Sequence, residues 1–355
     1  MNLDRIKLLC LLLVLILLPL PACAETFLVT SDLHLTGDAQ AREAALQALR
    51  EAAEHADAIL LLGDSTNNGR PAEHAQLLGF LQSLPVPAYV IPGNHDFAGG
   101  RWEFAESYAE YGLNAAFSRD EASLSCAVLT EGGVCLLLLD TNAFEGTAKP
   151  LGGISEDTCA WVSETLASLP EGTPVVACGH HPILPAERWQ GTPGAEALAR
   201  ALEGAGLYLC GHDHGFAAVR TDGLQQITVG QPQAYPGWAG RLEVTEEGLH
   251  WQVLPLYGEA VLQEMEAGAR SLAEGMARGT LKGTVHEGDE EAVQWFQTVF
   301  MASMHSELTE AACRALLSDP GADKWREIET KTVVKRWILG LLENCPQDVR
   351  RIDIP

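Results

Sequence analysis

The chain has 355 residues, of which 47% are hydrophobic and 20% charged, so it is long enough for one large domain and a smaller one. Its formal net charge of −25 opposes nonspecific binding to DNA or RNA, because such binding depends on Lys and Arg side chains that neutralise phosphates. A nucleic-acid polymer is therefore not an expected partner.

Residues 1–24 have the pattern of a secretory signal peptide. A basic start and an apolar run over residues 8–18 precede small residues at 22–24, where a signal peptidase could cleave. The apolar run is shorter than the roughly 20 residues that a membrane-spanning helix needs. Residues 20–23 also resemble a lipobox, in which Cys23 would carry a lipid, and an uncleaved anchor is a third alternative. We expect an exported protein, secreted or associated with the cell envelope, with membrane attachment through the N-terminus as an option.

Short apolar runs bounded by turn residues indicate buried strands in the next part of the chain. They cover residues 27–30, 58–62, 88–91, 134–139, 175–177 and 207–209. Helical patterns lie between the early runs, at residues 39–55 and 71–84. Later segments predicted as antiparallel strands lie around residues 215–220, 225–229, 240–244 and 250–253. This alternation predicts a layered α/β sheet, in which a site usually forms at the carboxyl ends of the strands.

Five polar motifs stand where these strands would give way to loops. They are Asp32-Leu33-His34, Gly63-Asp64, Gly93-Asn94-His95-Asp96, Gly179-His180-His181 and Gly211-His212-Asp213-His214. Their side chains include the imidazole, carboxylate and amide groups that divalent metal ions bind. The seven candidate metal ligands are Asp32, His34, Asp64, Asn94, His180, His212 and His214. One tetrahedral site needs fewer ligands than this, so the set predicts two metal ions.

Each motif carries little information alone. Gly-Asp is also an ordinary turn, and an isolated Asp-x-His is common. Gly-His-x-His is a stronger signal, because alternate residues of an extended chain point the same way and can meet at one ion. Six of the eleven histidines lie within the motifs, which independent scatter would rarely produce. Together the motifs favour a dinuclear metal site over a chance arrangement.

In order and content, the motifs resemble those of the calcineurin-like metallophosphoesterase superfamily. The resemblance covers residues 25–256, and the stretches 63–69 and 91–96 are most similar to the bacterial cyclic nucleotide phosphodiesterase-like branch. It implies a four-layer α/β/β/α sandwich, to which a C-terminal helical region is appended. We therefore expect a signal peptide at 1–24, the metallophosphoesterase domain at 25–256 and the helical region at 257–355.

The resemblance also implies a role for each motif residue. Asp64 would bridge two ions, of Mn, Fe or Zn. The first ion would be bound by Asp32, His34 and His214, and the second by Asn94, His180 and His212. His95 would lie beside the substrate as general acid or phosphate-binding group, and we expect Asp96 to orient it.

Further residues are expected near the substrate. His181 directly follows a metal ligand, so it could contact substrate or support the ligands from behind. Asn67 stands where purple acid phosphatases have a tyrosine ligand, so an iron–tyrosinate centre is not expected. Arg70 stands where related sequences often have an acidic residue. Aromatic residues at 188–189 and 235–238 could stack on a base, although loop packing is the favoured interpretation.

Residues 257–355 carry a different pattern. Helical segments are predicted at 259–276, 290–304, 307–317 and 323–343. The region has many basic residues and no motif with a known chemistry. A solvated helix face is the favoured interpretation, over a lid, a membrane-binding surface or a partner site.

The cysteines imply no disulfide framework in a chain of this size. Cys178 and Cys210 each lie two residues before a metal-binding histidine, and we interpret them as small buried packing residues. Cys313 and Cys345 could form a disulfide between C-terminal helices, which the sequence leaves open.

These observations predict a metal-dependent phosphoric ester hydrolase that acts on a small phosphodiester, such as a cyclic nucleotide. Two metal ions would activate water and neutralise charge on the phosphoryl group. A phosphomonoesterase or nucleotidase of the same fold is the main alternative. A non-catalytic metal-bound scaffold is disfavoured, because every expected ligand position and the catalytic histidine are filled. Neither the natural substrate nor the oligomeric state follows from the sequence.

Overall fold

The computed structural model describes residues 24–354, apart from residues 39, 41, 98–100, 143–151, 185–191, 222 and 330–332. The predicted signal peptide, except for its last residue, and the aromatic segment 188–189 lie outside the described residues. Among the described helices, none combines the length and the apolar character that crossing a membrane requires.

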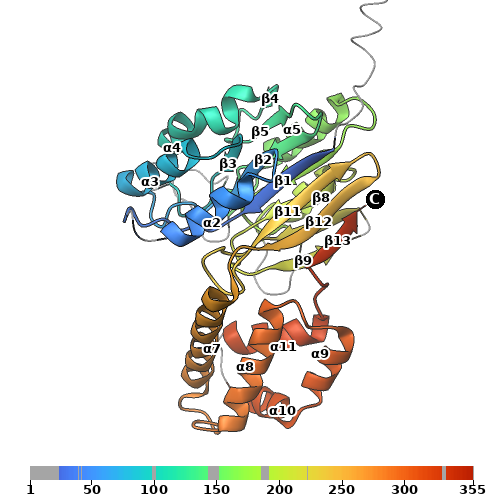
Figure 1. Ribbon diagram of the computed structural model, residues 1–355. Coiled ribbons are helices and arrows are strands. Elements are labelled where there is room, and N and C mark those ends of the chain that lie inside the picture. The colour runs from blue at the N-terminus through green and yellow to red at the C-terminus, as the bar shows by residue number, and fades with distance from the viewer. Residues whose placement is uncertain are drawn as a thin grey trace, which may run out of the picture.

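Two mixed β-sheets form the centre of the fold (Figure 1). The first has the order β13-β12-β11-β1-β2-β3. Its strands are β1 (Glu25–Thr30), β2 (Ala58–Leu62), β3 (Ala88–Ile91), β11 (Trp238–Thr245), β12 (Gly248–Pro255) and β13 (Arg351–Ile354). The strands β1, β2 and β3 are parallel, and β11, β12 and β13 extend the sheet in antiparallel pairs from β1.

The second sheet has the order β4-β5-β6-β7-β8-β10-β9. Its strands are β4 (Ser118–Arg119), β5 (Cys126–Leu129), β6 (Cys135–Leu138), β7 (Val175–Cys178), β8 (Gly206–Cys210), β9 (Ala217–Arg220) and β10 (Leu224–Thr228). We predicted β10 as an antiparallel strand, and this is correct only for its pairing with β9. It lies parallel to β8, because the β9–β10 hairpin places its second strand next to β8.

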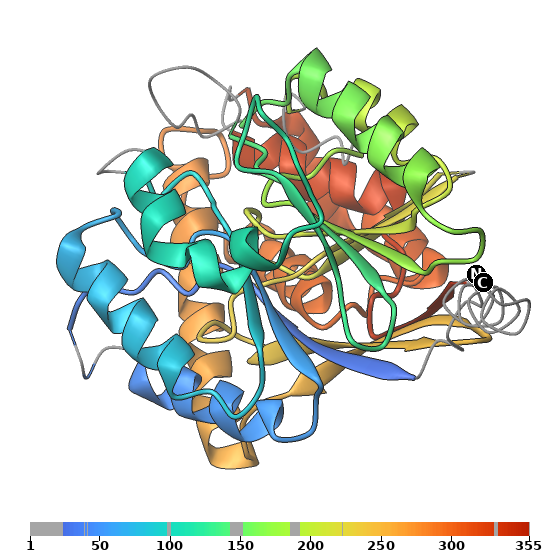
Figure 2. The ribbon, with the colours of Figure 1, turned by 90° about the horizontal axis from the view of Figure 1, so that it is seen from above.

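Helices cover the outer face of each sheet. Figure 2 shows α2, α3 and α4, coloured blue to teal, on one side and α5 and α6, coloured green, on the other. Their bounds are α2 (Glu43–Ala53), α3 (Pro71–Gln82), α4 (Arg101–Tyr108), α5 (Glu156–Ser168) and α6 (Ala195–Ala201). Two short 3-10 turns follow α4, at Ala109–Tyr111 and Leu113–Ala115. This arrangement confirms the predicted four-layer α/β/β/α sandwich.

Strand β1 shows how the layers are packed. Successive side chains of a strand point to opposite faces of the sheet. Phe27 and Val29 therefore pack between the two sheets, in the same cluster as Leu136 of β6. Leu28 points to the other face and packs with Leu49 of α2. Since both faces of the strand are covered, an unbroken apolar run is stable here.

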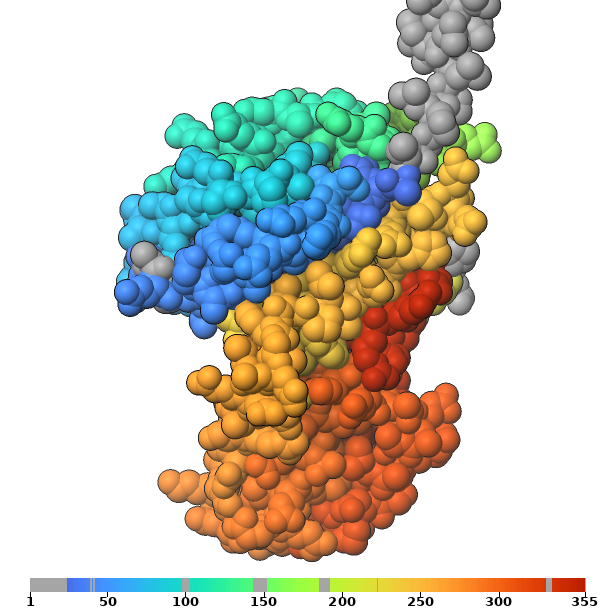
Figure 3. All heavy atoms as spheres, in the orientation of Figure 1, coloured from blue at the N-terminus to red at the C-terminus, as the bar shows by residue number. Residues whose placement is uncertain are grey.

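The C-terminal helices form a separate unit with a core of its own (Figures 1 and 3). They are α7 (Glu259–Leu281), α8 (Glu290–Met304), α9 (Glu310–Leu317), α10 (Pro320–Glu327) and α11 (Val333–Asn344). Large side chains such as Phe296, Trp325 and Ile338 fill the core of this unit. It therefore does not depend on the sandwich for its apolar packing.

Two predictions about this region were wrong in detail. The segment 323–343 is two helices, because α10 begins at Pro320 and ends at Glu327. The first turn of a helix tolerates proline, and the side chain of Asp319 caps it by accepting from the N–H of Gly321. The chain also does not stay helical to its end, since β13 pairs with β12. Its alternate residues Ile352 and Ile354 are buried in the core between the sheets.

The described cysteines are free thiols. Cys178 and Cys210 are fully buried in β7 and β8, which confirms that they are packing residues. Cys313 and Cys345 do not form a disulfide, and both thiols donate to the carbonyl of Leu308 at 3.7 and 3.3 Å.

Candidate metal centre

The backbone of the candidate ligands is unusual. Asp32, His34, Asp64, His212 and His214 all have φ between 44° and 72°. This left-handed region is unfavourable for residues other than glycine, and such residues cluster at functional sites. Only three other non-glycine residues in the described chain share it. The loops after β1, β2 and β8 are thus bent sharply at the residues that the motifs select.

The first cluster joins the loops after β1, β2 and β8. The Nε2 atoms of His34 and His214 lie 3.1 Å apart. Oδ1 of Asp32 lies 3.4 Å from Nε2 of His214, and Oδ2 of Asp64 lies 4.0 Å from Nε2 of His34. Ligand atoms of these four residues all lie within 4.8 Å of one another, close enough to hold one ion. These are the residues expected around the first metal.

The second cluster is next to the first and contacts Asp64 through His180. His180, at the end of β7, places its Nε2 3.2 Å from Oδ2 of Asp64. His212 and His181 complete a group whose nitrogen atoms lie within 4.8 Å of one another. Asp64 therefore lies between the two groups, in the position that a bridging ligand would need.

Asn94 belongs to the same centre. It follows β3, and the next residue, His95, donates its backbone N–H to Oδ1 of Asp64 at 2.8 Å. The Oδ1 atom of Asn94 is buried and has no hydrogen-bond donor among the described residues. Nδ1 of His34 is buried in the same state, and the buried Oδ1 of Asp32 and Nε2 of His180 have only ion-pair contacts, to His214 at 3.4 Å and to Asp64 at 3.2 Å. Burying such atoms without partners costs free energy, so the donor set fits bound metal ions that would satisfy them.

Contacts from behind fix how the ligands are oriented. His180 donates its Nδ1–H to the carbonyl of Leu62 at 2.8 Å, so Nε2, the atom that faces Asp64, is the one that can bind a metal once it loses its proton. Oδ2 of Asp32 accepts the backbone N–H of His212 at 3.0 Å. Nε2 of Gln233 donates to the carbonyl of Asp32 at 2.8 Å. These bonds leave the remaining ligand atoms free to bind an ion.

The protein sets the protonation state of these groups. Burial lowers the pKa of His34 to about 4 and that of His212 to about 3, and it also lowers the pKa of His214. These imidazoles are neutral at pH 7 and can donate a lone pair to a metal. Burial would also lower the pKa of His180, but the charge of Asp64 and the hydrogen bond to it outweigh this and raise the pKa to about 9. The Asp64–His180 pair is therefore ionic when no metal is bound.

His95 lies on the exposed side of this centre. Its ring meets that of His34 edge-on, with the centroids 4.9 Å apart. Its Nδ1 lies 2.6 Å from the carbonyl oxygen of Asn67, and since a carbonyl only accepts, Nδ1 carries the hydrogen. The remaining nitrogen, Nε2, is free to interact with a substrate. Asn67, expected to bind substrate, thus positions His95 through its backbone.

The expected role of Asp96 is wrong. Its carboxylate does not orient the His95 ring, because it accepts from Thr66 N–H and Oγ1 and from Gly93 N–H, at 2.7–2.8 Å. Asp96 is buried and joins the loop after β2 to the loop after β3. It supports the positions of Asp64 and Asn94, which belong to these loops.

His181 is held by a residue that the sequence analysis did not select. Oγ1 of Thr141 accepts the backbone N–H groups of His180 and His181 at 3.3 and 3.1 Å, and it lies 2.8 Å from Nδ1 of His181. A hydroxyl has two acceptor lone pairs and one hydrogen, so Thr141 donates to Nδ1. His181 then carries its hydrogen on Nε2, which makes it a donor into the centre rather than a metal ligand. The polar run 140–142 after the apolar run 134–139 is the signal that could have identified Thr141.

Arg70 is placed away from the buried part of the centre. It is exposed at the start of α3, and its backbone N–H donates to Glu73 at 3.2 Å. The backbone of Arg70 thus helps to form the start of α3. Contact of its side chain with substrate stays a prediction.

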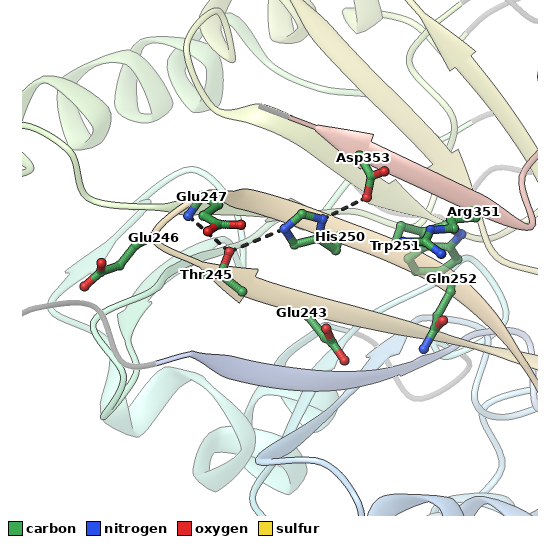
Figure 4. A pocket seen from close by; sticks show the side chains of 9 residues that line it. All are labelled: Glu243, Thr245, Glu246, Glu247, His250, Trp251, Gln252, Arg351 and Asp353. Carbon is green, nitrogen blue, oxygen red and sulfur yellow. Dashed lines mark hydrogen bonds and ion pairs between the residues drawn. The ribbon is translucent and has the colours of Figure 1, made fainter.

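A different hollow, of about 580 Å³, lies over β11, β12 and β13 (Figure 4). Its lining is acidic and includes Glu243, Glu247 and Asp353, which accepts a hydrogen bond from Nδ1 of His250 at 2.8 Å. None of its nine lining residues belongs to the five motifs. It is therefore not part of the candidate metal centre.

This fold and centre define a class of protein. The chain belongs to the family described as calcineurin-like phosphoesterase, which it matches over residues 25–216, more than half of its length. This confirms the family resemblance that the motifs predicted.

Several known proteins are similar to it. Glycerophosphodiester phosphodiesterase GpdQ of Enterobacter lignolyticus (strain SCF1) is 29% identical over 168 residues, or 45% of this chain and 57% of that protein. The match thus spans less than two thirds of that relative. 3',5'-Cyclic adenosine monophosphate phosphodiesterase CpdA of Escherichia coli (strain K12) is 23% identical over 69% of this chain and 79% of its own length. Among solved structures, purple acid phosphatase PPD1 of yellow lupin (Lupinus luteus) superposes with a TM-score of 0.48, at 14% identity over 67% of this chain and 53% of that one.

Proposed function

We propose that this chain hydrolyses a small phosphodiester with two divalent metal ions bound around Asp64. The observation that carries the proposal is that six of the seven candidate ligands meet in two adjoining clusters, while the seventh, Asn94, has a buried Oδ1 without a hydrogen-bond partner. His95, on the exposed side of the cluster, supplies a nitrogen for the substrate. Two relatives whose names specify phosphodiesters support a diester over a monoester.

The ligands would be shared between two ions. Asp32, His34 and His214 would bind one ion, and Asn94, His180 and His212 the other, with Asp64 contacting both. Mixed nitrogen and oxygen donors suit Mn, Fe or Zn. Such ions supply Lewis-acid chemistry, because they lower the pKa of a bound water and withdraw charge from a phosphoryl group.

The remaining chemistry belongs to side chains of the protein. The Asn67 carbonyl holds Nδ1–H of His95, so the imidazolium form of His95 would give the proton on Nε2 to the leaving oxygen and become neutral, with its hydrogen on Nδ1. His181 is fully buried, so its Nε2–H would donate to an oxygen inside the centre and hold it in place. His95 thus acts beside His34 of the first cluster, and His181 beside His212 of the second.

The choice between diester and monoester is tested with two chromogenic substrates. The purified protein should hydrolyse bis-p-nitrophenyl phosphate faster than p-nitrophenyl phosphate in the presence of Mn²⁺, Zn²⁺ or Fe²⁺. Chelation should abolish both reactions, because the phosphoryl group would no longer be neutralised. Faster hydrolysis of the monoester would support the phosphomonoesterase or nucleotidase alternative. Absence of both reactions, with two ions bound per chain, would support a scaffold.

We also propose that the protein is exported, on the strength of residues 1–24 alone. Expression of the full chain, followed by mass spectrometry of the mature N-terminus, tests this. A new terminus at Glu25 indicates cleavage after Ala24, and a lipid on Cys23 indicates a lipoprotein. An intact Met1 in the cytoplasmic fraction would contradict export.

A further inference from the structure

A cavity of about 780 Å³ connects the metal centre to the C-terminal helices. On the sandwich side it is lined by the end of the last motif, including His214, and by the loop that carries Gln233 and Tyr235. On the other side it is lined by α7, α8 and α11. Since His214 is also a candidate metal ligand, the cavity opens directly beside the proposed reaction site.

The two ends of the cavity differ in polarity. The end at the sandwich has Asp213, His214 and two glutamine side chains. The residues that the three helices contribute include no charged side chain, and the largest are apolar, such as Leu272, Phe300 and Trp337. A molecule that fits this cavity therefore needs a polar group at the metal centre and an apolar group among the helices.

One face of helix α7 lines this cavity. Its lining residues Met265, Gly268, Ala269, Leu272 and Met276 recur at the three- and four-residue spacing that forms one face of a helix. Leu272 is 59% exposed although it is large and apolar, and it lies at the cavity rather than in the core of the helical unit. Methionines are flexible and polarisable, and they adapt well to apolar ligands of variable shape.

The helices are fastened to the sandwich around this cavity. The hydroxyl of Tyr235 hydrogen-bonds with His305 at the end of α8. Oγ of Ser306 accepts the backbone N–H of Val349 at 2.9 Å, and the carbonyl of Val349 accepts from Trp251 in β12 at 2.9 Å. After this point, β13 joins the first sheet. The apolar surface is thus held next to the metal centre rather than turned away from it.

From this arrangement we propose that the natural substrate is an amphipathic phosphodiester, whose alkyl or acyl chain occupies the cavity between the sandwich and the helices. The inference rests on the proposed phosphodiesterase function and specifies its substrate class. A nucleobase would need hydrogen-bonding groups at the far end of the cavity, where the helices offer mainly apolar side chains. A hydrocarbon chain needs only apolar surface, and 780 Å³ lies within the range of ligand pockets, about 300–1,000 Å³.

The test uses a series of p-nitrophenyl alkyl phosphodiesters with methyl, butyl, octyl and decyl chains, each below its micelle concentration. We expect kcat/KM to rise with chain length, by up to about fourfold for each methylene that becomes buried. Calorimetric titration of the same compounds into chelated protein should show the same trend in affinity without turnover. An equal response to all chain lengths, with the methyl ester hydrolysed normally, would overturn the proposal and leave the phosphodiesterase intact. If no ester is hydrolysed but the titration shows that affinity rises with chain length, the proposed phosphodiesterase function is refuted and the proposed binding of the alkyl chain is retained.

A matched pair of variants locates the effect. Gly268 lines the cavity in the middle of α7, and a Cβ there would meet no atom within 4 Å. Gly268→Leu should therefore fold and fill the cavity, so that decyl and methyl esters bind alike. Gly275→Leu has the same open surroundings in the same helix but lies outside the lining, and it should keep the chain-length trend. Loss of the trend in both variants, or in neither, would contradict this location, and so would a preference for cyclic nucleotides over the decyl ester.

Discussion

At the scale of single residues, the metal centre combines backbone conformations and buried charges that are unfavourable for stability. Five of the seven candidate ligands have left-handed backbone, and the buried carboxylates of Asp32 and Asp64 lie beside histidines. Neither feature stabilises a protein without metal. The surrounding loops nevertheless hold them in place, which indicates that their arrangement serves binding rather than stability.

Removing the buried negative charge of Asp32 should stabilise the metal-free protein. Burial raises the pKa of Asp32 from its ordinary value of 3.8 to about 7, so the folded state binds its proton more tightly than the unfolded state does. The free energy of unfolding therefore falls as pH rises between these two pKa values, and the loss is complete at alkaline pH. Asp32→Asn keeps an oxygen for the N–H of His212 and should raise stability by about 0.5–2 kcal/mol in chelator at pH 8. Thermal unfolding at pH 5 and 8 measures it, and a gain that is larger at pH 5 would contradict this explanation.

Metal affinity should depend on the protonation of His180. Its pKa is about 9 when no metal is bound, because Asp64 and Asp32 stabilise its charge, whereas His34 and His212 are neutral above about pH 5. A metal must displace the proton from His180, so affinity should rise between pH 7 and 9 and then level off. Titration calorimetry in buffers with different ionisation enthalpies counts the protons released. Affinity that is constant across this range would exclude His180 as a protonated ligand.

His95 should act on the reaction and not on metal binding. It contacts Asp64 through its backbone N–H, which a side-chain substitution leaves in place. His95→Ala should lower kcat for a diester by about 10²–10⁴, the usual contribution of a general acid, with the metal content unchanged. The effect should be smaller for p-nitrophenolate, which leaves without a proton, than for an alkyl leaving group. Equal losses with both leaving groups would assign His95 to phosphate binding.

At the scale of elements, the strand ends are fitted tightly against each other. Gly93, after β3, lies where a Cβ would collide with the backbone and carboxylate of Asp64. Gly63, before Asp64, has φ of 87° and lies where a Cβ would be 2.7 Å from Nδ1 of His180. The glycines of the motifs therefore allow the loops after β2, β3 and β7 to approach closely enough to share Asp64.

This close approach gives a prediction with a control. Gly93→Ala should displace Asp64 and abolish activity, because backbone and not a flexible side chain is in the way. Gly79→Ala lies in α3 with no atom within 4 Å of the new Cβ, and it should add about 0.5–1 kcal/mol of stability with normal activity. Activity and thermal unfolding of both proteins measure this. Normal activity of Gly93→Ala would show that the loops can separate without loss of function.

The elements also show what the sequence could predict. The bounds of β2 and β3 were predicted to the residue, because each is an apolar run between turn residues and is buried on both faces. The motif residues were found because their types are specific to metal binding. The helices α4, α5 and α6 and the strands β4, β5 and β13 were missed. β13 is only four residues long, and its strand character depends on pairing with β12, which is far from it in the sequence.

Contacts between distant loops were equally hidden. Two hydrogen bonds depend on how loops from different strands meet. The carbonyl of Asn67 bonds to the ring of His95, and the hydroxyl of Thr141 bonds to the ring of His181. The prediction that Asp96 orients His95 failed for this reason. It rested on their adjacency in the sequence, whereas the folded loops place the Asp96 carboxylate next to Thr66. Residue types thus predicted which groups form the site, whereas their hydrogen-bond partners required the structure.

At the scale of the whole molecule, the sandwich and the helical unit divide the work. The sandwich gathers the metal ligands at the carboxyl ends of its parallel strands. The helical unit has an independent core and adds the apolar side of the cavity next to His214. The chain then returns to the first sheet through β13, which fixes both units to each other (Figures 1 and 3).

The most direct test of the metal centre is to count bound metal ions and measure turnover on the same samples of wild type and Asp64→Asn. Elemental analysis should find two divalent ions per wild-type chain and one or none in Asp64→Asn, because Asp64 lies between the two clusters. Turnover of bis-p-nitrophenyl phosphate should fall by at least about a hundredfold in the variant. Two bound ions and normal turnover in Asp64→Asn, or wild-type turnover that resists chelation, would contradict a reaction centred on Asp64.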